Sequence, residues 1–167
     1  MTKKKGLLLV AVLVLALSVG AFAFQNEPDG FRGLKWGDPV GEEMEYRDDL
    51  GGSKNYTRPE DKMSIGSAEF FMIIYEFYES RFFKVGLYFD GEDNYDLLEI
   101  ICKERYGREQ LDLGFYKLNW VGEKSLITLC YNTVNEIGFL LVYSRLIVLE
   151  KSEAEKKKEA EKAEGDW

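Results

Sequence analysis

Oxygen-bearing side chains alternate in the middle of the chain, at Asp90, Glu92, Asn94 and Asp96. This spacing is typical of the start of an EF-hand calcium loop. The rest of the loop pattern fails, because its sixth position requires glycine and its twelfth requires glutamate. The chain has Tyr95 and Ile101 at these positions. We therefore expect a strand end and a helix cap here, without calcium.

Histidine is absent from the 167 residues. Its absence excludes Ser-His and Cys-His nucleophilic pairs, His-ligated zinc and imidazole acid–base catalysis. The two cysteines, Cys102 and Cys130, are too few for a four-cysteine zinc site. Any metal would need carboxylate ligands. No set of carboxylates has metal-ligand spacing, so we predict no metal site and no cofactor.

Carboxylates alone support glycoside hydrolysis when two of them converge on a substrate. The densest acidic segment contains Glu42, Glu43, Glu45, Asp48 and Asp49. We interpret this segment as solvated surface charge, and no carboxylate pair stands out elsewhere. The sequence therefore predicts no catalytic residue and a non-enzymatic protein.

The N-terminus has the layout of a secretory signal peptide. Lysines at positions 3–5 precede an apolar run over residues 7–17, and the small side chains of Ala21 and Ala23 follow. We predict a signal peptide over residues 1–23. Its cleavage would leave a bacterial periplasmic or secreted protein.

An uncleaved membrane anchor is the alternative, because residues 6–24 carry no charge and are long enough to span a bilayer. Cleavage would instead leave Phe24 or Gln25 as the first residue. In an oxidising compartment Cys102 and Cys130 could form a disulfide. They could also remain separate thiols, because Cys130 lies on the less apolar side of its expected strand.

Beyond residue 23 the chain is acidic. The leader contains three lysines and no acid, so its removal changes the formal charge from −8 to −11. Such a charge disfavours nucleic acid and anionic membrane as partners, because both bind concentrated basic surfaces. We predict one domain over residues 24–150 and a charged Ala/Glu/Lys tail over residues 151–167.

The hydrophobic pattern predicts a mixture of helices and strands. Asp38-Pro39 is a helix-start signal, so a short helix is expected over residues 39–46. A loop with a Gly51-Gly52 turn is expected over residues 48–58. Asp93 or Asn94 should cap a packing helix that ends at Tyr106. Strands are expected over residues 69–78, 82–89, 115–120, 126–132 and 137–149.

This order predicts an α+β fold with a mostly antiparallel sheet of about five to six strands. One main helix should pack on the sheet, in a possible αβββ-αβββ layout, and a charged C-terminal helix or tail should follow. Residues 69–78 are apolar on both alternating faces, so we expect both faces of that strand to be covered.

The segment from Gly30 to Asp38 reads GFRGLKWGD and follows the leader directly. It resembles the start of a group of small uncharacterised bacterial exported proteins and lipoproteins that share a GFRGxxWG segment. The group has no known activity, so the resemblance implies no functional residue. The chain lacks the lipid-bearing cysteine of the lipoprotein members. Its expected layout is also similar to the helix-plus-sheet fold of β-lactamase inhibitor proteins and outer-membrane assembly lipoproteins.

These observations favour a protein that acts by binding. Our first hypothesis is a binding or adaptor domain that contacts another envelope protein or a second copy of itself through the sheet. The alternative is a carrier of a small apolar ligand in an aromatic-lined cavity between sheet and helix. No motif in the sequence names the partner or the ligand.

Overall fold

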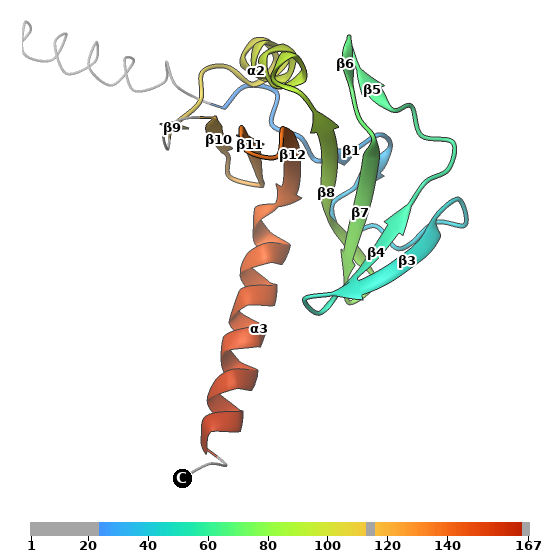
Figure 1. The fold of residues 1–167 in the computed structure, drawn as a ribbon. Helices are drawn as coiled ribbons and strands as arrows, with labels where there is room; N and C mark the ends of the chain where they lie inside the picture. The colour runs from blue at the N-terminus through green and yellow to red at the C-terminus, as the bar shows by residue number, and fades with distance from the viewer. Residues whose placement is uncertain (1–23, 113–115, 165–167) are drawn as a thin grey trace, which may run out of the picture.

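The computed structural model describes residues 24–112 and 116–164. Within these residues, eight strands form one sheet in the order β3-β4-β7-β8-β12-β11-β10-β9, and every neighbouring pair is antiparallel (Figure 1). The strands are β3 (Glu45–Leu50), β4 (Ser53–Thr57), β7 (Met72–Tyr78), β8 (Arg81–Asp90), β9 (Leu111–Asp112), β10 (Lys117–Val121), β11 (Ser125–Asn132) and β12 (Ile137–Ser144).

Two helices and two small hairpins complete the described part of the chain. The helices are α2 (Glu92–Tyr106) and α3 (Arg145–Glu164). The hairpins pair β1 (Gly30–Phe31) with β2 (Leu34–Lys35) and β5 (Ser64–Ile65) with β6 (Ala68–Glu69). The predicted α+β fold with an antiparallel sheet is confirmed.

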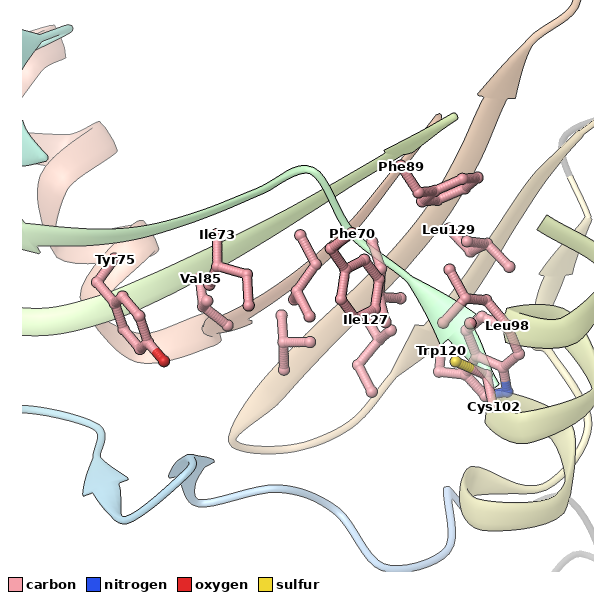
Figure 2. Packing of buried hydrophobic residues seen from close by; sticks show 14 of the residues in the cluster. Phe70, Ile73, Tyr75, Val85, Phe89, Leu98, Cys102, Trp120, Ile127 and Leu129 are labelled. Carbon is pink, nitrogen blue, oxygen red and sulfur yellow. The ribbon is translucent and has the colours of Figure 1, made fainter. Parts of the chain in front are cut away.

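One face of the sheet, which we call the front face, carries the main core. Buried apolar side chains form rows across the central strands because antiparallel registers align them. One row is Tyr75, Val85, Val142, Ile127 and Trp120, and the next is Ile73, Leu87, Leu140, Leu129 and Leu118. Figure 2 shows Leu98 and Cys102 of α2 beside Trp120 of this face.

Residues 24–38, which we call the strap, cover the part of the front face that α2 leaves open. Phe31 packs on Tyr75, with ring centroids 6.1 Å apart, and Trp36 stacks on Phe82 at 5.0 Å. The Gly37 amide donates to the Phe82 carbonyl, and the Phe82 amide donates to the Asp38 carbonyl. The conspicuous residues of the GFRGLKWGD segment therefore have packing roles.

The N-terminal half of the strap is held at the opposite end of the sheet. The Phe24 ring stacks on Tyr106 at 5.6 Å, and the Gln25 amide donates to the Tyr106 carbonyl. Glu27 accepts hydrogen bonds from the backbone amides of Lys124 and Ser125 at 2.6 and 2.7 Å. The residues that predicted cleavage would leave first are thus docked on α2.

The other face of the sheet, the back face, is covered only at one corner by the described residues. Ile147 and Val148 of α3 pack there on Tyr78 and Phe83. The Lys151 ammonium donates to the Gly51 carbonyl at 2.6 Å. The rest of α3 projects away from the sheet (Figure 1) and is largely exposed. Half-buried apolar side chains remain across the back face: Met72, Tyr88, Phe139, Leu141, Tyr143 and Leu126.

The two cysteines are free thiols on different faces of the molecule. Cys102 lies in the front-face core, where burial raises the pKa of its thiol to about 12. Cys130 pairs across the ladder with Phe139 and lies half-buried on the back face. The sheet lies between them. Of the two alternatives left open by the sequence, a disulfide or separate thiols, the structure has separate thiols.

The predicted hairpin around residue 79 and the packing helix are confirmed. Glu79 and Ser80 form the turn between β7 and β8, both with positive φ, as a two-residue hairpin turn requires. The predicted cap of α2 is wrong, because Gly91 occupies the N-cap position. The Asn94 side chain instead donates to the Asp90 carbonyl and accepts from the Glu69 amide.

Three other predictions are wrong. The short helix over residues 39–46 is absent, and the expected loop over residues 48–58 is most of the β3–β4 hairpin. These strands raise the sheet above the predicted five to six strands, and the first αβββ unit does not exist. The predicted strand over residues 137–149 ends at Ser144, and α3 begins at Arg145.

Candidate functional site

An apolar pocket of about 330 Å³ lies where α2, the strap and the sheet meet. Its wall on the helix side includes Leu98, Ile101 and Cys102, and Arg105 and Tyr106 follow at the end of α2. These residues share one side of α2 because positions three and four apart face the same way. Leu140 and Val142 of β12 also line the pocket, and both are less than 5% exposed. The interior is therefore apolar and shielded.

The strap and the β5–β6 hairpin form the remaining walls. Phe31 of the strap and Ile65 of β5 line the pocket opposite α2. The φ of Arg32 is +46°, which lies in the left-handed region. This turn between β1 and β2 brings Arg32 to the pocket, together with Pro28 and Gly30.

Two guanidinium groups belong to the pocket lining, those of Arg32 and Arg105. Both also line a more open hollow beside the pocket, which the exposed residues Asp29 and Lys35 share. Because Arg105 is exposed while Leu140 and Val142 are buried, the cationic groups lie at the mouth and the apolar groups lie deep.

A buried polar cluster lies next to the mouth. The Asp61 side chain is 6% exposed, accepts a 2.5 Å hydrogen bond from the Tyr75 hydroxyl, and lies 3.4 Å from Arg32 and 3.8 Å from Arg58. Burial and the bond to Asp61 raise the pKa of the Tyr75 hydroxyl, so this hydroxyl remains a donor. The cluster fixes the position of Arg32.

Arg32 is fully engaged in that position. Its guanidinium donates to the backbone carbonyls of Lys62 and Ser64 at 2.6 and 3.0 Å, besides its ion pair with Asp61. The cluster holds one buried carboxylate, and the nearby Glu43, 3.6 Å from Arg58, is 52% exposed. The cluster therefore lacks the pair of converging carboxylates that glycoside hydrolysis needs.

The acidic residues that stood out in the sequence are placed separately. The carboxylate of Glu92, at the start of α2, accepts a hydrogen bond from the Tyr116 hydroxyl, while Asn94 bridges β8 and β6. The five acidic residues over positions 42–49 are exposed, as expected. Across residues 24–112 and 116–164, no group of three or more Asp, Glu or Cys side chains is placed to hold a metal ion.

Sequence reasoning did not find the polar cluster or the pocket. Arg32, Tyr75 and the loop that holds Arg58 and Asp61 are three separate segments, and no periodic pattern links them. Arg105 lies in the apolar arc of α2. A cation in such an arc indicates a charged group at the edge of an apolar surface.

Comparison with protein-family models, curated proteins and solved structures finds no match to this chain. The resemblance to exported bacterial proteins carried by Gly30 to Asp38 therefore stays a prediction. Among the helices of the described residues, none combines the length and the apolar character needed to cross a membrane.

We predict that Asp61→Asn lowers the free energy of unfolding by about 3 kcal/mol, because it removes the buried carboxylate that two partly buried guanidinium groups share. Urea denaturation measures this change. Glu43→Gln, which removes an exposed partner of Arg58, is the matched control and should cost no more than about 0.5 kcal/mol. Equal losses in the two variants would contradict the role assigned to Asp61.

Proposed function

We propose that this protein is exported, loses residues 1–23, and acts without catalysis by holding a small apolar ligand in the pocket between α2 and the strap. The observation that carries the proposal is the pocket of about 330 Å³ with an apolar interior and a polar mouth. Ligand sites in proteins have this character and begin at about 300 Å³.

The size of the pocket limits the ligand to a small molecule. A dry apolar cavity of about 150 Å³ accommodates benzene, so roughly twice that volume suits about a dozen non-hydrogen atoms. Ligand burial would add contacts with the half-buried side chains of Phe31, Ile65 and Ile101. The free thiol of Cys102 belongs to the same wall and remains protonated at neutral pH, because burial raises its pKa.

We predict that decan-1-ol binds the protein saturably with 1:1 stoichiometry, and that Ile101→Trp weakens this binding at least tenfold. Ile101 is half-buried in the pocket wall, so an indole ring there occupies ligand space. Isothermal titration calorimetry measures the affinity, and circular dichroism verifies the fold of each variant.

Ile100→Trp is the matched control. Ile100 is the preceding residue of the same helix, is 56% exposed and does not line the pocket. It should bind decan-1-ol like the wild type. Absence of saturable binding to the wild type, or equal binding by the two tryptophan variants, would refute the pocket as a ligand site.

The export proposal has its own test. We expect N-terminal sequencing of the protein recovered from the native periplasm or medium to begin at Phe24 or Gln25. Docking of these residues on Tyr106 supports a mature chain that starts there. A native protein that retains its initiator methionine, in the cytosol or in the inner membrane, would contradict cleavage.

A second candidate function is contact with the apolar surface of another envelope protein, through the back face. The observation that favours it is the row of half-buried side chains Met72, Tyr88 and Phe139, beside Phe71, which is 50% exposed. A contiguous apolar patch on a soluble protein frequently marks an interaction site.

For this candidate we predict that a periplasmic pull-down captures one protein, and that Phe71→Lys abolishes its capture. A charge at this position places a cation in the apolar contact. Val134→Lys makes the same change at a 91% exposed turn residue and should leave capture intact, as should Ile101→Trp. Recovery of the bait alone, with a monomeric mass, would count against this candidate.

A further inference from the structure

The two arginines at the pocket mouth differ in how many hydrogen bonds and ion pairs their guanidinium groups already make. Arg32 is engaged by Asp61 and by two backbone carbonyls. Within the described residues, the guanidinium of Arg105 has no ion pair or hydrogen bond, and its closest described interaction is with the Tyr106 ring, 5.6 Å from Cζ to the centroid. A guanidinium carries five donors that suit a carboxylate or a phosphate.

The charge around the mouth is unusual for this chain. The protein is acidic overall, with a formal charge of −8 before removal of the leader. The mouth and its adjoining hollow nevertheless hold Arg32, Lys35 and Arg105 against Asp29, and because the buried Asp61 pairs with Arg32, the cations exceed the carboxylates there by one. Such a local excess of positive charge attracts and orients an anionic group at the entrance. The apolar interior cannot accommodate that charge, because burying an unpaired anion is costly.

Resting on the proposed function, we propose that the ligand is a medium-chain carboxylate: its chain enters the pocket between α2 and β12, and Arg105 binds its carboxylate at the mouth. Arg105 is the specificity-determining residue, because it is the cation of the pocket lining with donors to spare within the described residues. The chain supplies the apolar contact and the head group sets the orientation. The class comprises acids whose unbranched body has about ten carbons, a size that the pocket volume accommodates.

The test compares decanoate with decan-1-ol, which share a chain length and differ in head group. Calorimetry on the full mature protein should give a decanoate affinity about tenfold higher than that of decan-1-ol, as expected for one partly exposed charge-assisted hydrogen bond. Arg105→Gln should remove this tenfold preference, so that the two probes bind this variant with equal affinity. Arg108→Gln makes the same charge change at an exposed residue outside the pocket lining and should keep the preference.

Raised salt provides a second readout. Decanoate should bind more weakly in about 0.5 M NaCl than in about 0.05 M NaCl, because salt screens an exposed ion pair. Binding of decan-1-ol should not weaken. If decan-1-ol binds as tightly as decanoate, or if the two arginine variants behave alike, the carboxylate inference is overturned while the apolar pocket stands. If neither probe binds, the proposed function fails as well.

Discussion

The whole structure depends on covering one wide face of a sheet with little chain. Eight strands about 4.8 Å apart extend roughly 34 Å across, whereas the 15-residue α2 is about 22 Å long and roughly 10 Å wide. One helix therefore cannot bury the front face. The strap supplies the missing cover with Phe31, Leu34 and Trp36. Hydrogen bonds to Phe82 and Tyr106 hold it, since it has little regular secondary structure.

The pocket lies where α2 and the strap meet, because each of them covers only part of the front face. The α2 helix and the irregular strap meet over the sheet and do not fill the space between them. Residues of β12 and Ile65 also line this space. The buried carboxylate of Asp61 holds Arg32 in place beside the pocket. Arg32 and Asp61 therefore both hold the strap on the sheet and shape the mouth of the pocket.

Sequence patterns predicted elements whose burial is periodic and missed those whose burial is not. The α2 helix and the β7–β8 hairpin present regular apolar spacing and were found. Every residue of β3 is exposed, so this edge strand shows no alternation. The apolar run over residues 145–149 was assigned to a strand, but it is helix, with Ile147 buried and Leu149 exposed. The pocket and the Asp61 cluster join residues far apart in sequence, which no local pattern reveals.

The attachment of Glu27 to Lys124 and Ser125 has a consequence for the order of folding. These partners are nearly 100 residues apart in sequence, and chains emerge from the ribosome N-terminus first. The strap is therefore synthesised before the elements that receive it, and its aromatic side chains have no native partners until β7, β8 and α2 exist. Closing so long a loop is entropically costly and slow. The segment made first therefore cannot complete its docking until Lys124 and Ser125 have been made.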